Sequence, residues 1–226
     1  HPETLLFGED VAAKGGVYGV TRGLHARFGA GRVFDTLLDE TSILGLALGT
    51  AVSGFVPIPE IQYLAYLHNA DEQLRGEAAT VQFFSQGQYR NGMVVRIAGY
   101  GYQKGFGGHF HNDDSVAVLR DIPGLVIASP SRPDDAAAML KTCVAAAKVD
   151  GSVCAFLEPI ALYHTRDLHE EGDGGWLATP TVDHVPLGSA RTYGNGRHLT
   201  MLTWGNGPPM SPRDARRLEG RGLRAR

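Results

Sequence analysis

The chain has 226 residues, of which 43% are hydrophobic and 20% are charged, and its formal net charge is −3. These values predict a folded globular protein with room for one full domain and part of a second. The small negative charge and the lack of a Lys/Arg run argue against nucleic-acid binding. No stretch approaches the ~20 apolar residues of a membrane helix, so we expect no membrane partner. Two cysteines without CxxC spacing favour reduced thiols and a cytoplasmic location.

Six short apolar runs have the length and composition of buried strands, and helical patterns separate them. They span residues 4–7, 32–34, 56–61, 93–97, 125–128 and 153–157. This alternation predicts an α/β domain of three layers, in which helices cover both faces of a doubly wound, mainly parallel sheet.

Three longer helices are predicted between these strands. One follows Ser131, a candidate cap, and carries apolar residues at helical spacing as far as Ala147. A second covers residues 63–84, and a third covers residues 40–52 with Gly45 and Gly49 on one face. Two helical glycines cost roughly 1 kcal/mol each relative to alanine. We therefore expect the glycine face to pack against another backbone, either in a second copy or within the same chain.

The pattern loosens after Glu158. Residues 167–185 contain acids and glycines, including Gly172-Asp173-Gly174, and are predicted to form a linker with a turn. A strand over residues 198–204 and a helix over residues 211–218 are expected next. The predicted organisation is a first domain over residues 1–166, the linker over residues 167–185, and the truncated start of a second α/β domain over residues 186–226.

Short motifs follow one another in a fixed order along almost the whole chain. They are Leu6-Phe7-Gly8-Glu9-Asp10-Val11, Gly15-Gly16-Val17-Tyr18, Arg32-Val33-Phe34-Asp35-Thr36 leading into Asp39-Glu40, Pro59-Glu60-Ile61-Gln62-Tyr63, His109-Phe110-His111 and Pro123-Gly124-Leu125. Together they resemble the beta chain of the decarboxylating component of 2-oxo acid dehydrogenase complexes, a group that includes the pyruvate and branched-chain enzymes. The resemblance implies a transketolase-like pyrimidine-binding domain, followed by the start of a transketolase-like C-terminal domain.

The same resemblance implies a cofactor and a set of partners. The chain would bind the aminopyrimidine ring of thiamine diphosphate, while an alpha-type chain or a fused domain would hold the diphosphate and Mg²⁺. The implied reaction is oxidative decarboxylation of a 2-oxo acid with acyl transfer to a lipoyl group. The implied partners are therefore the alpha-type chain or domain, a second copy of this chain and a lipoyl acyltransferase. Which 2-oxo acid is used is left open.

Glu40 is the residue that the resemblance identifies as the activator of the cofactor. A carboxylic acid must exchange a proton with N1' of the pyrimidine, and Glu40 stands where the family places that acid. Taken alone, Glu40 is more simply interpreted as an ordinary acid in the first turn of a helix, where it interacts favourably with the helix dipole and Asp39 is the cap.

Four further residues complete the implied site. Tyr66 would lie against the pyrimidine ring, and Gln62 lies one turn before it; from the residues alone, Tyr66 is equally a core aromatic. His111 would act on the substrate or lipoyl side, with His109 as its neighbour. The resemblance assigns no metal ligand to this chain.

Two other functions stay open at this point. His109, His111 and Asp113 superficially resemble the paired-histidine run of metal-dependent hydrolases, which would require further histidine ligands after later strands. The chain is also compatible with a non-catalytic or regulatory subunit of the same fold.

Overall fold

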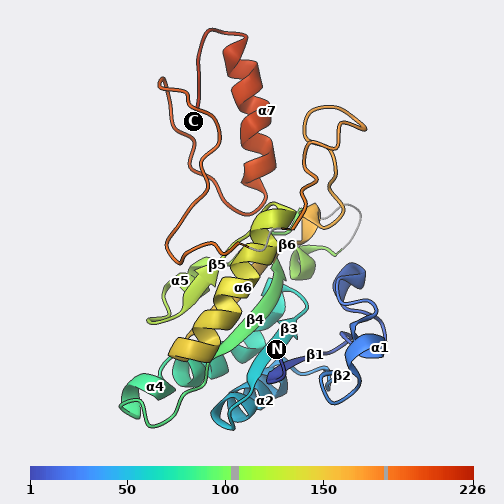
Figure 1. Ribbon diagram of the computed structural model, residues 1–226, viewed down its shortest axis with the longest axis vertical. Helices are drawn as coiled ribbons and strands as arrows, with labels where there is room; N and C mark the ends of the chain where they lie inside the picture. The colour runs from blue at the N-terminus through green and yellow to red at the C-terminus, as the bar shows by residue number, and fades with distance from the viewer. Residues whose placement is uncertain (103–106, 181–182) are drawn as a thin grey trace.

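The computed structural model describes residues 1–102, 107–180 and 183–226. At its centre lies a six-stranded sheet of order β2-β1-β3-β4-β6-β5, and every described pairing is parallel (Figure 1). The strands are β1 (Thr4–Gly8), β2 (Val33–Asp35), β3 (Val56–Ile61), β4 (Met93–Gly99), β5 (Val126–Ala128) and β6 (Val153–Pro159). All six predicted strands are confirmed, with ends that differ by two residues at most.

The sheet separates two hydrophobic cores. Successive strand residues point to opposite faces, so Val95 and Ile97 of β4 enter one core while Val94 enters the other. The first core packs against α2 (Glu40–Val52) and the helical segments after β3, and the second packs against α6 (Pro133–Asp150). Figure 1 shows α6 lying across one face of the sheet. The predicted three-layer arrangement is therefore confirmed.

Helix α2 has the predicted bounds, and it begins with the predicted cap, because the carboxylate of Asp39 accepts the backbone N–H of Ser42 at 3.0 Å. A Cβ atom built on Gly45 or Gly49 would meet no heavy atom within 4 Å. The expected packing of this face within the same chain is therefore wrong, because the two glycines lie at the open surface of α2, beside the exposed Leu46.

The continuous helix predicted for residues 63–84 is wrong. This stretch divides into α3 (Leu64–Leu67), the 3₁₀ turn η2 (His68–Ala70), the π-helical segment η3 (Gln73–Ala78) and α4 (Val81–Phe84). Backbone angles stay helical at the joints that flank η2 and η3, so the path continues while its hydrogen-bond spacing changes. Two features explain the irregularity: Gly76 is a weak helix former, and the hydroxyl of Thr80 donates to its carbonyl at 2.7 Å.

Helix α6 is confirmed, but its predicted cap is wrong. Arg132 is the cap residue, Pro133 opens the first turn, and Gly151 ends the helix in the left-handed conformation. The hydroxyl of Ser131 instead donates to the carbonyl of Gly205 at 2.7 Å. Ser131 therefore holds the C-terminal part of the chain against the sheet domain.

Short helical segments fill the remaining connections of the sheet domain. They are η1 (Val17–Gly19), α1 (Leu24–Phe28), η4 (His109–His111), α5 (Ala117–Arg120) and η5 (Ile160–Leu162).

The C-terminal part contains α7 (Gly207–Glu219), which Figure 1 shows projecting from the sheet domain. It begins four residues before the predicted start, because prolines at positions 208 and 209 fit the first turn of a helix. The strand predicted for residues 198–204 is wrong: residues 196–201 form hydrogen bonds with residues 224–226, including one parallel bridge between Leu199 and Ala225. Only one isolated bridge forms among these described residues, so the hydrogen bonds do not continue as a ladder.

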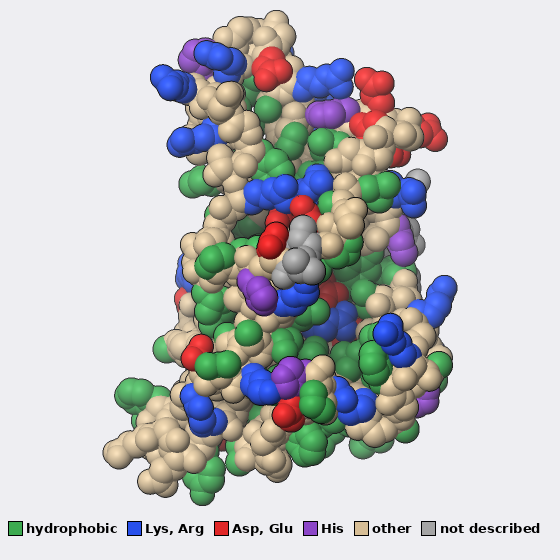
Figure 2. Space-filling model, viewed as in Figure 1, with side chains coloured by type: hydrophobic (Ala, Val, Ile, Leu, Met, Phe, Trp, Pro, Cys, Tyr) green, Lys and Arg blue, Asp and Glu red, His purple; other side chains and the backbone are tan. Residues whose placement is uncertain are grey.

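The predicted turn at Gly172-Asp173-Gly174 is confirmed. The carboxylate of Asp173 accepts backbone N–H groups from residues 168, 169, 170 and 175, which closes the loop on itself. Residues 181–182 of the predicted linker lie outside the described residues. Figure 2 shows basic side chains gathered around the C-terminal segment and acidic ones on the neighbouring loop. Among the described residues, no helix is long and apolar enough to cross a membrane.

Candidate functional site

The predicted site lies at the carboxyl edge of the parallel sheet. Glu9 and Asp10 follow β1, Gln62 follows β3, and Tyr100 follows β4. In open α/β sheets, ligands bind outside the carboxyl ends of the strands, near the point where the strand order reverses. Here β2 is paired on one side of β1 and β3 on the other, so the strand order reverses at β1, beside these residues.

Glu40 is the first residue of α2 and is only 7% exposed. Its Oε2 atom lies 3.4 Å from the amide nitrogen of Asn69, a long and weak hydrogen bond. The carbonyl of Asn69 in turn accepts the hydroxyl of Thr41 at 2.8 Å. Within the described residues, this nearly buried carboxylate therefore has hydrogen-bonding capacity left for a ligand, and Asn69 of η2 lies beside it.

Glu9, which follows β1, lies close enough to Glu40 to respond to its charge. Burial raises the pKa of Glu9, and the negative charges of Asp10, Glu40 and Glu60 raise it further. The protonated form of Glu9 is therefore favoured relative to an exposed glutamate.

Tyr66 and His111 form the centre of the other half of the site. The hydroxyl of Tyr66 lies 2.9 Å from Nε2 of His111, and Nδ1 of His111 lies 2.8 Å from the carbonyl oxygen of Gly107. Because a carbonyl can only accept, Nδ1 carries the proton in the neutral ring. Nε2 is then the acceptor of the Tyr66 hydroxyl, and a substrate that displaces this hydroxyl would find a basic nitrogen.

Gly107 is required for this position of His111. Its φ angle is 111°, and a Cβ atom at this residue would lie 2.2 Å from the Cβ of His111. Any side chain here would push the imidazole out of place.

A third ring completes the cluster. Tyr63 meets His111 edge-on, with ring centroids 4.5 Å apart, and meets Tyr66 edge-on at 5.6 Å. Burial, together with the neighbouring Tyr18 and Tyr66, raises the pKa of Tyr63 to about 12, so its hydroxyl stays protonated at neutral pH. The imidazole of His111 is therefore held on two sides by aromatic rings.

Gln62 and His109 have other neighbours. The amide of Gln62 donates to the carboxylate of Asp10 at 3.2 Å, which ties the end of β3 to the end of β1. His109 is exposed and stacks on Phe110, with centroids 3.9 Å apart. Of the five predicted site residues, the structure brings Tyr66 and His111 into direct contact and links Glu40 to them through η2.

The paired-histidine loop does not have the geometry of a metal site. His111 is turned toward Tyr66 and Gly107, whereas Asp113 is turned toward His68. No group of three His, Cys, Asp or Glu side chains within the described ranges could hold a metal ion. The hydrolase alternative therefore gains no support.

A buried ion cluster joins three strands at the same edge of the sheet. Arg96 of β4 donates to Glu60 of β3 at 2.8 Å, and to both carboxylate oxygens of Glu158 of β6 at 2.6 and 2.9 Å. Burial raises the pKa of Glu60, and Arg96 offsets this only in part. Removing one member of such a cluster costs about 3–5 kcal/mol, so its role here is to fix the strand ends that carry the site.

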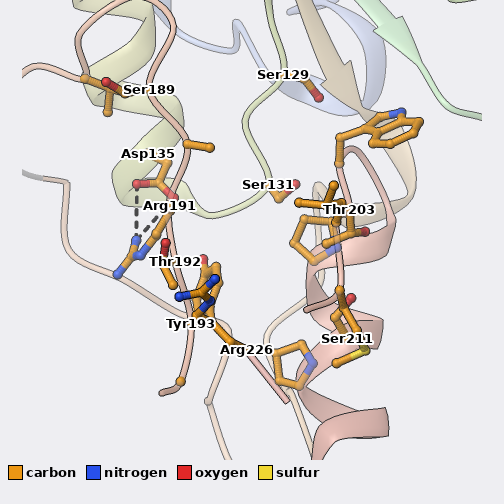
Figure 3. Close-up of a pocket in the computed structure, with 18 of the residues that line it drawn as sticks. Ser129, Ser131, Asp135, Ser189, Arg191, Thr192, Tyr193, Thr203, Ser211 and Arg226 are labelled. Atoms are coloured by element: carbon orange, nitrogen blue, oxygen red, sulfur yellow. Dashed lines mark hydrogen bonds and ion pairs between the residues drawn. The ribbon is translucent and has the colours of Figure 1, made fainter. Parts of the chain in front are cut away.

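A separate cleft of about 990 Å³ lies between α6 and the C-terminal segment (Figure 3). Arg191 crosses its rim and pairs with Asp134 at 2.9 Å and with Asp135 at 3.1 Å. None of the predicted site residues is among the described residues that line it. The cleft therefore belongs to the contact between the two parts of the chain.

Sequence reasoning missed several residues of the site. Asn69 was detectable in principle, because it lies one turn after Tyr66 in a helical pattern and can reach the same surface. Tyr63 lies one turn before Tyr66 and gave the same signal. Gly107 gave none, because its contact with His111 depends on the fold of the loop.

The chain is similar to a known protein family and to several known proteins. A family model described as "Transketolase, pyrimidine binding domain" matches residues 1–164. The subunit beta of 3-methyl-2-oxobutanoate dehydrogenase from Mycobacterium tuberculosis is 36% identical over 203 residues, which are 89% of this chain and 54% of that protein. The subunit beta of the pyruvate dehydrogenase E1 component from Staphylococcus epidermidis is 34% identical over 223 residues, which are 96% of this chain and 62% of that protein.

Among solved structures, one titled "Split gene transketolase, inactive beta4 tetramer" matches with a TM-score of 0.75 and 15% identity, over all of this chain and 63% of that one. This likeness shows the fold. The chain spans little more than half the length of the curated relatives it matches. The predicted fold type and the resemblance to beta subunits are both confirmed.

Proposed function

The chain belongs to the transketolase pyrimidine-binding domain family, and from this premise we propose that it supplies the pyrimidine-activating half of a thiamine-diphosphate-dependent 2-oxo acid dehydrogenase. When bound, the cofactor supplies the carbon nucleophile and the electron sink for removing CO₂ from a 2-oxo acid. The protein's share is to orient the pyrimidine ring, to control its protonation and to place the substrate.

The carboxyl edge of the sheet fits an aminopyrimidine. Glu40 offers a nearly buried carboxyl group with one weak hydrogen bond among the described contacts, which suits proton exchange with a ring nitrogen. Tyr66 is half-buried and offers a flat aromatic partner one turn before Asn69. We propose that Glu40 exchanges a proton with N1' of the pyrimidine while Tyr66 and Gln62 border the ring. The position of Glu40 is the observation that carries the proposal.

His111 would act on the substrate or lipoyl side. Its Nε2 atom is the unprotonated nitrogen in the neutral ring and accepts the hydroxyl of Tyr66. We propose that the imidazole, in the form that carries a proton on Nε2, donates to the substrate carboxylate or to the developing oxyanion. His109, exposed on the same short turn, would border the entrance.

The diphosphate and its Mg²⁺ are proposed to lie on an alpha-type chain or a fused domain. The Gly172-Asp173-Gly174 sequence is used inside its own loop, where the Asp173 carboxylate accepts four backbone N–H groups. It therefore has no free acceptors to offer to a cation. The other proposed partners are a second copy of this chain and a lipoyl acyltransferase.

The names of the relatives guide the choice of substrate. They include pyruvate dehydrogenase and 3-methyl-2-oxobutanoate dehydrogenase subunits, so we propose pyruvate or a branched-chain 2-oxo acid. The free, buried Cys143 and Cys154 are consistent with a reducing compartment, which supports the cytoplasm. We also propose that residues 1–166 form the pyrimidine domain, residues 167–185 the linker, and residues 186–226 the start of a C-terminal transketolase-like domain.

Substitution of Glu40 by Gln tests the proposal. This change keeps the size of the side chain and removes its proton exchange, so decarboxylation should fall by about a hundredfold or more. The unfolding temperature should stay near that of the parent, because glutamine can still accept from Asn69. Glu77→Gln, an exposed acid in η3, is the matched control and should keep full activity. Near-normal turnover of the Glu40→Gln enzyme, assembled with its alpha-type partner, would contradict the assignment.

A further inference from the structure

One short turn of the chain contacts both ends of the proposed site. Tyr66 reaches His111, and Asn69 reaches Glu40. Between them, His68 at the start of η2 extends in a third direction, where its Nε2 atom lies 2.9 Å from Oδ2 of Asp113. Residues 66–69 thus hold the activating carboxylate, the imidazole and the loop that carries the imidazole.

Asp113 is built to be a fixed anion at this contact. Its Oδ1 atom accepts the backbone N–H of Ser115 at 2.8 Å and also the hydroxyl of Ser115. Burial opposes ionisation of Asp113, but the hydrogen bonds from Ser115 and His68 outweigh it and lower the pKa of this carboxyl. Its second oxygen is then directed at His68, and the side chain of Asp113 is only 22% exposed.

Several side chains of this loop point away from the body of the protein. His109, Phe110 and Asn112 are exposed, and the amide of Asn112 donates back to the carbonyl of Gly108 within the loop. His111 in η4 contacts Tyr66 and Tyr63. Asp113, two residues further along the chain, pairs with His68. The imidazole and the residue two positions after it are therefore both anchored by residues 63–68.

We propose that His68 is a positioning residue, whose ion pair with Asp113 clamps residues 107–115 so that His111 stays against Tyr66. This inference rests on the proposed function, since it deepens the role of His111. His68 itself touches neither cofactor nor substrate. In the closed form of the loop His111 contacts Tyr66, and in an open form it does not. A half-exposed ion pair shifts the equilibrium between two such forms by up to about fivefold, which sets the size of the expected effect.

Chemical labelling of His111 tests the clamp without any cofactor. Diethyl pyrocarbonate attacks an unprotonated imidazole nitrogen, and Nε2 of His111 is covered by Tyr66 while the loop is closed. In the full-length protein, His68→Phe should raise the labelling rate of His111 by about threefold to fivefold, as measured by peptide mass spectrometry. His68→Gln keeps a side-chain donor for Asp113 and should restore much of the protection.

The matched control is Arg75→Leu. Arg75 is also half-exposed and also forms ion pairs, with Asp71 at 3.3 Å and with Glu72 at 3.0 Å, but these lie on its own helical segment. This variant should leave the labelling of His111 unchanged. A parent-like rate for His68→Phe, or an equal increase for Arg75→Leu, would overturn the inference.

Kinetics of the assembled enzyme separate positioning from general damage. His68→Phe should lower the rate of the step that needs His111 by a similar factor and leave the affinity for thiamine diphosphate unchanged, because the Glu40 side is intact. Loss of cofactor affinity would indicate general damage and contradict the clamp. If His111→Gln itself keeps full turnover, the proposed role of His111 fails, whereas the labelling result still decides whether the clamp exists.

Discussion

At the scale of single residues, Tyr66 has two roles that one substitution separates. Tyr66→Phe keeps the ring that would border the pyrimidine and removes the hydroxyl that contacts Nε2 of His111 at 2.9 Å. A hydrogen bond of this kind contributes about 0.5–1.5 kcal/mol, so turnover should fall by about twofold to tenfold while the affinity for thiamine diphosphate stays the same. Steady-state kinetics and a binding titration measure the two effects.

The matched variant is Tyr66→Ala, which removes the ring as well. It should lose cofactor affinity in addition to turnover. Equal cofactor affinity in the Phe and Ala variants would show that Tyr66 does not border the pyrimidine.

How far individual site residues could be predicted depends on what determines their positions. Glu40 follows its capping residue directly, so a local motif was enough to place it at the start of α2. The contact between Tyr66 and His111 joins residues 45 positions apart. It depends on the division of the predicted helix over residues 63–84 into shorter segments, which periodicity does not reveal, and on the backbone of Gly107. Motif order identified both side chains, but only the fold shows that they touch.

At the scale of elements, the loop around Asp173 should respond to pH. Four backbone N–H groups, those of Gly175 and Glu170 first, donate hydrogen bonds that hold the pKa of Asp173 well below its ordinary value of 3.8. A lowered pKa in the folded state means that the ionised form stabilises the loop. That contribution is complete above pH 3.8 and is lost as the pH falls below it toward the folded-state pKa.

Hydrogen exchange measures this directly. Protection of the amides of residues 168–170 and 175 should be constant from neutral pH down to about 4 and should then decline. Asp173→Asn should reduce the protection even at pH 7, whereas Glu171→Gln, an exposed neighbour, should not. Unchanged protection in Asp173→Asn would show that the carboxylate does not hold the loop.

Some elements can be predicted from the sequence more reliably than others, for physical reasons. The central strands of the sheet are covered on both faces, so their buried side chains form nearly continuous apolar runs; all seven residues of β4 are buried. The stretch after β3 has a correct buried face, as Leu67, Ala70 and Leu74 show, but periodicity reports burial and not hydrogen-bond spacing. The segment at residues 198–204 has strand composition, yet a strand also requires a neighbour, and composition does not report one.

At the scale of the whole molecule, several polar contacts join the sheet domain to the later part of the chain. Ser131 donates to the carbonyl of Gly205, the amide of Asn206 donates to the carbonyl of Tyr100 at 2.9 Å, and the indole of Trp176 donates to Ser131 at 3.1 Å. Tyr100 directly follows β4, so the C-terminal part is attached close to the carboxyl edge that carries the proposed site. A partner chain that binds the C-terminal part would therefore also lie near the proposed site.

The glycine face of α2 gives the last prediction, which concerns assembly. A side chain at Gly45 meets open space within this chain, and leucine favours a helix by about 0.8–1 kcal/mol relative to glycine. Gly45→Leu should therefore leave the isolated chain folded and slightly more stable. If the face instead packs against α2 of a second copy, as we propose, the same substitution should weaken the oligomer and lower activity.

Sedimentation velocity measures the oligomeric state of these variants, and thermal unfolding measures their stability. Gly45→Ala is the matched control, because it adds helix propensity with one methyl group and should disturb the oligomer less than leucine. A Gly45→Leu protein that is stabilised and still assembles and turns over like the parent would contradict the interface. In that outcome, a different partner would have to cover the exposed Leu46 and Val52 on α2. Helix packing between two copies would then not explain the two glycines.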